Sequence, residues 1–294
     1  MSPPAPKASV ILPAYLSHAT ITRSLESLQS QTFQDFETIV VDSSPDDRTA
    51  DAVRASCAEV KLIRSDKPLR PHEARNRGAA EASGGVLAFT DPDCLAAPDW
   101  LALLVDWHDK GKRVVGGVIA PEAGWWNRTL HWIRLGWWLT GGGPGPHREL
   151  ASANTSLARD VWLELGSYGS DYFSCDSELS WRARALGYEI WFDPRAAVTH
   201  VHPVTFTGLF RDRFARGRDF GLMRSESLKW PKSRSLGYML ATPILPLVMT
   251  LRAARYAGSA GRVPEWLLLT PLQALFHGVW CVGEATAHWS RLTR

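Results

Sequence analysis

The chain has 294 residues, and 33 Lys and Arg against 30 Asp and Glu give a formal net charge of +3. A hydrophobic content of 45% supports a sizeable core and excludes the disordered, collagen-like and coiled-coil classes. The four cysteines are widely separated, so no CxxC pair supports a zinc cage or a redox motif. This cysteine usage predicts a reduced, cytosolic compartment.

The charge is distributed unevenly along the chain. Residues 1–204 hold 20 Lys and Arg against 25 Asp and Glu, a balance of −5, whereas residues 205–294 hold 13 against 5, a balance of +8. The basic last third is also rich in Leu, Trp and Pro, which favours an anionic membrane surface over nucleic acid as its partner. The apolar run at 10–12 is too short for a signal peptide, so we expect no export.

Short apolar segments alternate with amphipathic ones in the first ninety residues. The pattern predicts strands at 8–12, 38–41, 61–64 and 86–90, and helices at 20–31, 49–57 and 72–83. Such alternation indicates βαβ units, so we predict an α/β fold with a mostly parallel sheet covered on both faces. Ligands of such sheets bind beyond the carboxyl ends of the strands. Neither GxGxxG nor GxxxxGK[ST] is present, which argues against a dinucleotide fold or a P-loop.

Asp91 and Asp93 flank Pro92 directly after the apolar strand at 86–90. Two carboxylates at a strand end suit Mg²⁺ or Mn²⁺ shared with substrate phosphates. The alternative is that these residues build a turn and cap a helix that starts near Pro98. We expect Cys94 to be a small buried side chain and not a ligand.

Arg75 lies on the helix that precedes this strand. A guanidinium matches the oxygens of a diphosphate, so Arg75 could bind one. The alternative is a place on a solvated helix face.

Taken together, several segments resemble family 2 glycosyltransferases of the GT-A fold. In the first half they are SVILPAY, IVVDSSPDD, EARNRGAAEASGG and VLAFTDPDC. In the second half they are ANTSLARD at 153–160, CDSELSWR at 175–182, similar to the family's "ED…L..R" stretch, and VTHVH at 198–202, similar to its "V.H.H". The resemblance covers about residues 8–225 in the expected order.

This resemblance implies metal-dependent transfer of a sugar, with inversion, from a UDP-, GDP- or dTDP-linked donor. Mn²⁺ or Mg²⁺ would be the cofactor. The donor-side residues that it implies are Pro13, Ala14 and Tyr15 around the nucleoside, Asp42 on the base, Asp91 and Asp93 on ribose and metal, and Arg75 on the diphosphate.

The resemblance also implies roles in the second half of the chain. Asp176 would be the general base that takes the proton of the acceptor hydroxyl. His200 would touch metal or diphosphate, with His202 a weaker candidate, and Asn154 and Glu178 would lie on the acceptor side. At 198–202, alternate residues of a strand would turn both histidines to the same side.

The chain departs from the family pattern immediately before the general base, where the family carries an acidic residue and this chain has Cys175. A neutral thiol removes one charge from the pocket, which could lower the pKa of Asp176. It also leaves Glu178 as a rival base. Positions 176 and 178 do not share a helix face, so only one of them can point into the cleft.

A tryptophan-rich stretch separates the two blocks of motifs. Trp126, Leu130, Ile133 and Trp137 form a helical stripe. An amphipathic helix at a membrane interface, a helix packed on the sheet, and a platform for sugar rings all stay open. The glycine-rich residues 141–146 that follow could be a lid over the donor or a plain linker.

The last third predicts a basic helix at 206–223 and two apolar stretches at 236–251 and 266–282. Each stretch is slightly short of the ~20 residues that a spanning helix needs. We interpret them as interfacial or re-entrant, with a membrane-crossing hairpin or a soluble extension as alternatives. The predicted division is a flexible 1–7, a catalytic domain at 8–225 and a hydrophobic, basic extension at 226–294.

The resulting hypothesis is a membrane-associated glycosyltransferase at the cytoplasmic face of a bacterial membrane, acting on a lipid or saccharide acceptor and not on nucleic acid. A sugar-nucleotide nucleotidyltransferase is the enzymatic alternative, but PAYLSHAT lacks the glycine-rich basic loop that it predicts. A catalytically silent membrane scaffold is the non-enzymatic alternative.

Overall fold

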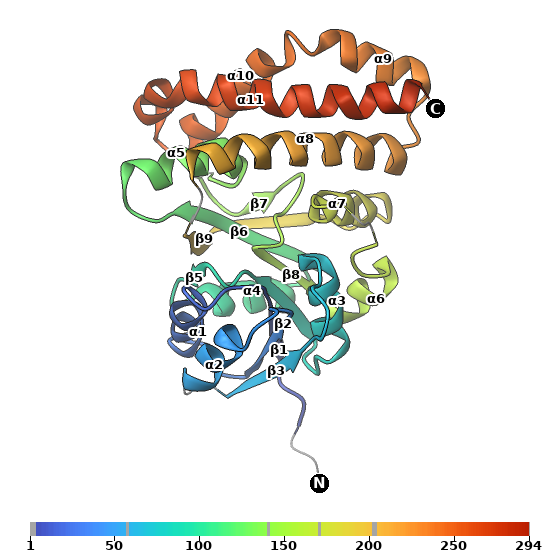
Figure 1. The fold of residues 1–294 in the computed structure, drawn as a ribbon. Helices are drawn as coiled ribbons and strands as arrows, with labels where there is room; N and C mark the ends of the chain where they lie inside the picture. The colour runs from blue at the N-terminus through green and yellow to red at the C-terminus, as the bar shows by residue number, and fades with distance from the viewer. Residues whose placement is uncertain (1–3, 57–58, 140–141, 170–171, 202–204, 294) are drawn as a thin grey trace. The chain divides into compact units, whose positions relative to one another are not determined.

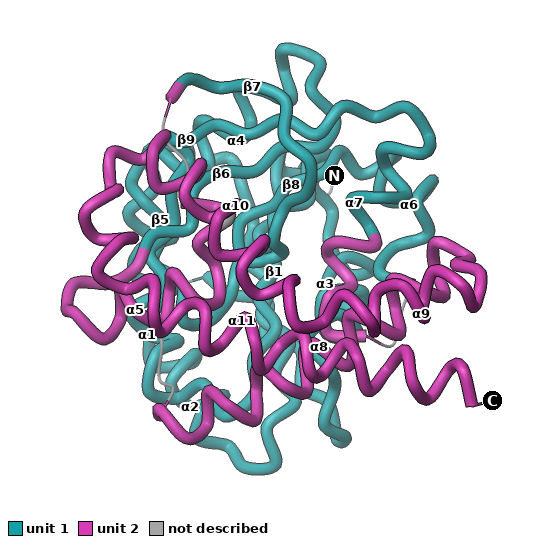
Figure 2. The backbone as a smooth tube through the Cα atoms, turned by 90° about the horizontal axis from the view of Figure 1, so that it is seen from above, with its two compact units in different colours: residues 1–120, 143–169, 179–201 teal, residues 121–142, 170–178, 202–294 magenta. Residues whose placement is uncertain are grey.

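The computed structural model describes residues 4–56, 59–139, 142–169, 172–201 and 205–293 (Figure 1). The chain forms two compact units, drawn in different colours in Figure 2. Unit 1 comprises residues 1–120, 143–169 and 179–201, and unit 2 comprises residues 121–142, 170–178 and 202–294. The predicted division at residues 7 and 225 stays a prediction, because these units follow packing and not continuous sequence.

Unit 1 is built on a sheet to which the described residues contribute nine strands. The strands are β1 (Ala8–Ala14), β2 (Phe36–Asp42), β3 (Val60–Arg64), β4 (Val86–Thr90), β5 (Cys94–Ala96), β6 (Val114–Pro121), β7 (Gly145–Pro146), β8 (Asn154–Ala158) and β9 (Ile190–His200). Their order is β3-β2-β1-β4-β8-β6-β9-β5, and β7 pairs with β9. The strand predicted at 86–90 is confirmed with the same bounds.

The first four strands pair in parallel. β1 pairs in parallel with β2 and β4, and β2 with β3. β8 is antiparallel to β4 and β6, while β5 and β7 are antiparallel to β9. The α/β fold is confirmed, but "mostly parallel" is correct only for the first half, because β5, β7 and β8 join the sheet through antiparallel pairs. All seven residues of β1 are buried, as expected for a strand covered on both faces.

Three helices predicted beside this sheet begin and end close to their expected positions, namely α1 (Ile21–Gln29), α2 (Arg48–Ala55) and α3 (Pro71–Ala80). The sheet is also accompanied by α4 (Trp100–Asp109), α6 (Arg159–Leu165) and the later part of α7 (Cys175–Ala185). α3 packs very closely on β1, because a Cβ at Gly78 would lie 2.5 Å from Cγ2 of Ile11. Only glycine permits this approach, which fixes α3 beside the carboxyl ends of β1 and β2.

Unit 2 is helical in the part of it that the structure describes. It contains α5 (Trp125–Arg134), a 3₁₀ helix (Gly136–Trp138), α8 (Phe206–Ser227), α9 (Lys232–Ala241), α10 (Leu245–Ser259) and α11 (Val263–Leu292). Within this unit α11 packs against α8, α9 and α10 (Figure 1). α8 and α11 touch at Gly217, where a Cβ would lie 2.2 Å from the carbonyl oxygen of Trp280.

The tryptophan-rich helix α5 packs on other helices of unit 2. Leu130 and Ile133 of its predicted stripe are buried with Leu209 of α8 and Phe276 of α11. One of the three predictions for this helix was packing against the sheet. The buried side chains of α5 pack against the helices α8 and α11. The side chain of Trp137 lies outside the described residues.

The apolar C-terminal segments differ from one another in continuity. α11 is long and apolar enough to cross a membrane, by length and composition alone. The stretch predicted at 236–251 is divided into α9 and α10, whose axes are bent by 81°. The break contains Pro243, whose ring cannot continue a helix.

Candidate metal and nucleotide site

The carboxyl ends of the first strands bring the predicted donor-side residues to one edge of unit 1. In the parallel register Ala14 pairs with Asp42, and Asp42 pairs with Arg64. Pro13 lies one residue earlier in β1, and Tyr15 follows the strand with its side chain 49% exposed. The edge therefore combines an exposed aromatic side chain with the strand end that carries Asp42.

Asp42 is fully buried and held by several donors. Its Oδ1 accepts hydrogen bonds from the amide and hydroxyl groups of Ser44, at 2.9 and 2.6 Å. Its Oδ2 forms an ion pair with Nη1 of Arg64 at 2.5 Å. The hydroxyl of Ser44 in turn accepts from the amide of Leu16, at 2.8 Å. The sequence alone did not identify Arg64. It is the last residue of β3, which runs parallel to β2, and this position is a signal that places it beside Asp42.

The Asp91–Asp93 segment is a turn, and this turn assembles a ligand cluster. The amide of Cys94 donates to the carbonyl oxygen of Asp91 at 3.0 Å, which closes the turn. The turn leads into β5 and not into a helix cap, and Cys94 of β5 pairs with His200 of β9. This pairing places Nε2 of His200 3.7 Å from Oδ1 of Asp93. The turn interpretation and the metal interpretation are therefore compatible.

Four side chains converge at this point. Asp91, Asp93, Cys94 and His200 each offer one ligand atom, and these atoms all lie within 4.8 Å of one another. Burial, with the two nearby carboxylates, raises the pKa of the Cys94 thiol well above its usual range. Mg²⁺ and Mn²⁺ also prefer oxygen ligands to sulfur. Two carboxylates and one imidazole remain, a set that fits a divalent cation with open positions for phosphate oxygens.

Arg75 is buried beside the cluster, with 4% of its side chain exposed, so the solvated-face alternative is wrong. Its Nη2 forms an ion pair with Oδ1 of Asp91. The role on the diphosphate stays a prediction, but the pair places a fixed positive charge next to the ligand set.

Asn154 is buried in β8 and links three other elements. Its Nδ2 donates to the carbonyl oxygens of Val118 and Ala196, both at 2.8 Å. Its Oδ1 accepts from Nε1 of Trp100 at 2.9 Å. Both N–H groups of the Asn154 amide therefore donate to backbone oxygens of the sheet, which is typical of a residue that stabilises the fold. Its predicted place on the acceptor side stays a prediction.

Asp176 and Glu178 lie in the first turn of α7, in unit 2. They are two positions apart on this helix, so their side chains point in different directions. Oδ1 of Asp176 accepts from the amide of Ser177 at 2.9 Å, and Cys175 is buried. The roles of general base and rival base stay predictions. His202 lies outside the described residues.

Comparison with known proteins identifies the family. The model of glycosyl transferase family 2 matches residues 9–160, more than half of the chain. The chain belongs to this family. The matched segment contains Asp42, Arg75, Asp91 and Asp93, whereas Asp176 and His200 lie beyond it.

Curated relatives are similar to only part of the chain. The glucosyl-dolichyl phosphate glucuronosyltransferase of Haloferax volcanii is 31% identical over 180 residues, which cover 56% of each chain. The probable glycosyltransferase YdaM of Bacillus subtilis is 27% identical over 238 residues, which cover 74% of this chain and 57% of that one. The chain thus spans little more than half the length of these relatives.

A solved structure confirms the GT-A fold. The mannosyltransferase PcManGT from Pyrobaculum calidifontis, in complex with GDP-Man and Mn²⁺, superposes with a TM-score of 0.64 at 19% identity. The similarity covers 99% of this chain and 88% of that one.

Proposed function

We propose that this family 2 protein transfers a sugar, with inversion, from a nucleotide-sugar donor to a hydroxyl group of a lipid or saccharide acceptor. The observation that carries the proposal is the convergence of Asp91, Asp93 and His200 at the strand edge that also holds Asp42. The solved neighbour binds GDP-Man with Mn²⁺, which supports a nucleotide sugar and a divalent metal as ligands of this edge.

The three ligand residues would hold Mn²⁺ or Mg²⁺. A bound divalent cation supplies neutralisation of the charge that develops on the departing diphosphate. Tyr15 would border the nucleoside with its exposed ring, and Asp42, which is fully buried, would accept from the base only by exchanging Ser44 or Arg64 as a partner. Arg75, already fixed by Asp91, would keep a second positive charge near the phosphates.

Asp176 would take the proton from the attacking acceptor hydroxyl. Its neighbour Cys175 is a buried cysteine, so the site has one carboxylate fewer than the family pattern. Glu178 is the alternative base. An Asp176→Asn variant that binds donor but transfers no sugar supports the assignment, and full activity of that variant moves the role to Glu178.

We further propose that unit 2 binds an anionic membrane surface. Large apolar side chains are exposed along its last three helices, namely Leu236, Leu240, Ile244, Leu247 and Leu251 on α9, α10 and their connection, and Leu267, Leu268, Leu275, Val282 and Trp289 on α11. Residues 227–264 contain six Lys and Arg and no Asp or Glu. Apolar side chains flanked by cations are typical of helices that lie in the headgroup region.

The packing of α11 favours a position in the membrane plane over a crossing. α11 contacts α8 from Phe276, which meets Phe210, to Glu284, which pairs with Arg224 at 2.9 Å. A crossing α11 would draw α8 into the hydrocarbon. The charged residues that would follow are Arg211, Asp212, Arg213, Arg216, Arg218, Asp219 and Arg224. Placing each charged side chain in the hydrocarbon costs about 2.5–3.5 kcal/mol. The sum of these costs exceeds the free energy gained by inserting one apolar helix.

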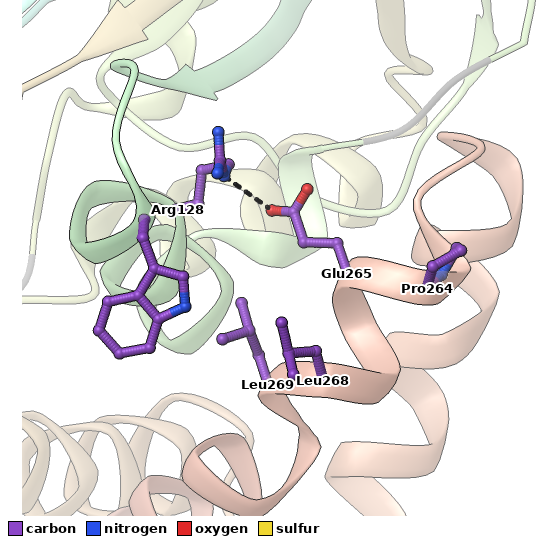
Figure 3. Close-up of a pocket in the computed structure, with 6 residues that line it drawn as sticks. Arg128, Pro264, Glu265, Leu268 and Leu269 are labelled. Carbon is purple, nitrogen blue, oxygen red and sulfur yellow. Dashed lines mark ion pairs between the residues drawn. The ribbon is translucent and has the colours of Figure 1, made fainter.

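An apolar hollow of about 300 Å³ lies at the beginning of α11 in unit 2 (Figure 3). Its lining residues are Trp125, Arg128, Pro264, Glu265, Leu268 and Leu269. Figure 3 shows Arg128 facing Glu265, with 3.8 Å between Nε and Oε1. Leucines beside a single charge pair suit an amphiphile, which supports a lipid or lipid-linked acceptor.

The reaction is tested with a panel of nucleotide sugars in the presence of Mn²⁺, Mg²⁺ or EDTA. We expect metal-dependent release of one nucleotide, lost in Asp93→Ala and retained in Asp35→Asn, which changes an exposed residue before the amino end of β2. Binding of a nucleotide without turnover would indicate a missing acceptor. No binding of any nucleotide would reject the proposal and leave the silent scaffold.

Membrane association is tested by flotation with vesicles of phosphatidylcholine, with and without phosphatidylglycerol. We expect the Leu240→Glu/Leu247→Glu variant to lose binding, and Leu163→Glu, an equally exposed leucine of unit 1, to keep it. Cysteines introduced at Gly261 and Thr293, before and after α11, should both react with an impermeant maleimide outside sealed vesicles. Labelling of only one of them would show that α11 crosses the membrane.

A further inference from the structure

Arg213 of α8 is a buried cation without an acceptor. Its side chain is 6% exposed, and its Nε is fully buried without a hydrogen bond. Within the part of the chain that the structure describes, it makes neither a hydrogen bond nor an ion pair. Its guanidinium carbon lies over the ring of Trp280, 4.3 Å from the ring centre.

The surroundings of Arg213 add positive charge. Burial, with smaller contributions from Arg134 and Arg216, lowers its pKa to about 9, so the group stays protonated at neutral pH. The carboxylate of Asp212 lies near it but faces both neighbours. Arg216 Nε donates to Asp212 at 2.7 Å, and Arg134 Nε lies 3.6 Å from the other oxygen. Glu284 also interacts electrostatically with Arg213, but its carboxylate pairs with Arg224.

The same helix shows what a structural buried arginine looks like. Arg224, three turns later, pairs with Glu284 at 2.9 Å and lies over the rings of Trp230 and Tyr238. The fold thus supplies a carboxylate where a buried guanidinium serves packing. Arg213 has the aromatic support without the carboxylate.

An unpaired buried charge is strongly unfavourable, and a buried apolar side chain at this position would be more stable. Stacking on Trp280 orients the planar guanidinium and leaves its N–H groups unused. Arginine donors arranged in this way match the oxygens of a phosphate group, which can accept bonds from two or three guanidinium groups at once.

We propose that Arg213, together with Arg134 and Arg216, binds a phosphate group. These three arginines belong to unit 2 and are not part of the ligand cluster of unit 1. The phosphate site would therefore be separate from the proposed donor site. The phosphate could belong to a membrane lipid or lipid-linked acceptor, a source that rests on the proposed function, or to a free phosphate compound.

The test compares wild type with Arg213→Met, Arg213→Lys and Arg211→Met, the last being an exposed arginine of the same helix. In the first arm, melting temperature is followed with inorganic phosphate or pyrophosphate against chloride at equal ionic strength. In the second arm, co-sedimentation is measured with phosphatidylcholine vesicles that carry either phosphatidate or phosphatidylglycerol at matched charge.

We expect Arg213→Met to melt at a higher temperature than wild type and to lose its phosphate response. A response confined to phosphatidate vesicles assigns a lipid phosphate, and one confined to soluble phosphate assigns a free compound. In the responding arm, affinity should fall by about tenfold or more in Arg213→Met, and Arg211→Met should keep it. Arg213→Lys keeps the charge without the planar fork, so it should fold and bind phosphate weakly even if the Met variant does not fold.

Two results would overturn the proposal. One is a wild type that responds to phosphate in neither arm. The other is a response that Arg213→Met, or Arg213→Lys if the Met variant does not fold, retains in full. Because no nucleotide sugar is used, phosphate binding by a protein that transfers no sugar would reject the proposed reaction and leave this site intact.

Discussion

Arg75 of unit 1 and Arg213 of unit 2 are similarly buried but lie in different surroundings. In unit 1, Arg75 meets Asp91 and the partly exposed Arg64 meets Asp42, so each cation orients a carboxylate at the strand edge. In unit 2, Arg213 lies over the ring of Trp280 and forms no ion pair with the described residues, whereas Arg224 of the same helix pairs with Glu284. The comparison indicates that the strand edge of unit 1 balances its cations with carboxylates, whereas the surroundings of Arg213 keep positive charge suited to an anion.

The largest expected effect comes from removing a carboxylate of unit 1. We expect Asp93→Asn to lower the rate of sugar transfer by about a thousandfold, because the variant loses a metal ligand and its share of charge neutralisation. Steady-state rates at saturating Mn²⁺ provide the measurement, with Asp35→Asn as the control. A loss smaller than tenfold would show that the cluster around His200 does not serve the reaction.

Breaking the compensated pair of unit 1 should reduce stability. Without metal, we expect Arg75→Met to lower the free energy of unfolding by about 3 kcal/mol, since it leaves Asp91 without its partner. Mn²⁺ should restore part of the loss by replacing the missing cation. Urea unfolding with and without Mn²⁺ gives both values. Lys61→Met, which breaks an exposed pair with Glu81, should change stability by about 0.5 kcal/mol at most.

Unit 1 should also lose stability in mild acid. Burial, assisted by Arg113, lowers the pKa of His108 to about 4 from an ordinary 6.5, and its Nε2 lies 2.9 Å from the hydroxyl of Ser156. Between these values the unfolded chain binds more protons, so stability present above pH 6.5 is lost as the pH falls toward 4. We expect a loss of about 1–3 kcal/mol, allowing for partial solvent exposure. A flatter pH profile in His108→Gln would identify the source, and an unchanged profile would exclude this residue.

The smallest effect has the opposite sign to that of Arg75→Met. We expect Arg213→Met to raise the free energy of unfolding by about 1 kcal/mol, because an unpaired buried charge is replaced by an apolar side chain. The matched Arg224→Met should instead destabilise unit 2, since it leaves Glu284 buried without a partner. Both are measured by thermal unfolding. Destabilisation by Arg213→Met equal to that by Arg224→Met would end the contrast between the units.

The strand-edge part of the site could be predicted from sequence. Parallel strands meet at one edge, so the residues after β1, β2 and β4 were expected to lie together, and the register confirms it for Ala14 and Asp42. His200 was implied only by family resemblance. Its place next to Asp93 depends on the short antiparallel pair of β5 and β9, and a three-residue strand leaves no periodicity to detect.

Charge pairing between distant elements could not be predicted. Arg64 was missed because its role depends on the register between two strands, and the basic helix at 206–223 did not reveal which of its arginines would be buried or what each would meet. The break between α9 and α10 was closer to prediction, since Pro243 marks it in the sequence. The packing of α5 on α8 and α11 could not be predicted either. Leu130 and Ile133 of α5 contact residues of α8 and α11 that lie far from them in the sequence.

The most direct measurement is binding of Mn²⁺, followed by electron paramagnetic resonance, in the presence of GDP, UDP or dTDP. The account predicts one bound Mn²⁺ per chain, strengthened by one of the three nucleotides, with binding lost in Asp93→Asn and weakened in His200→Asn. Mn²⁺ binding that is indifferent to Asp93 and to every nucleotide would contradict the proposal that this strand edge is the donor site.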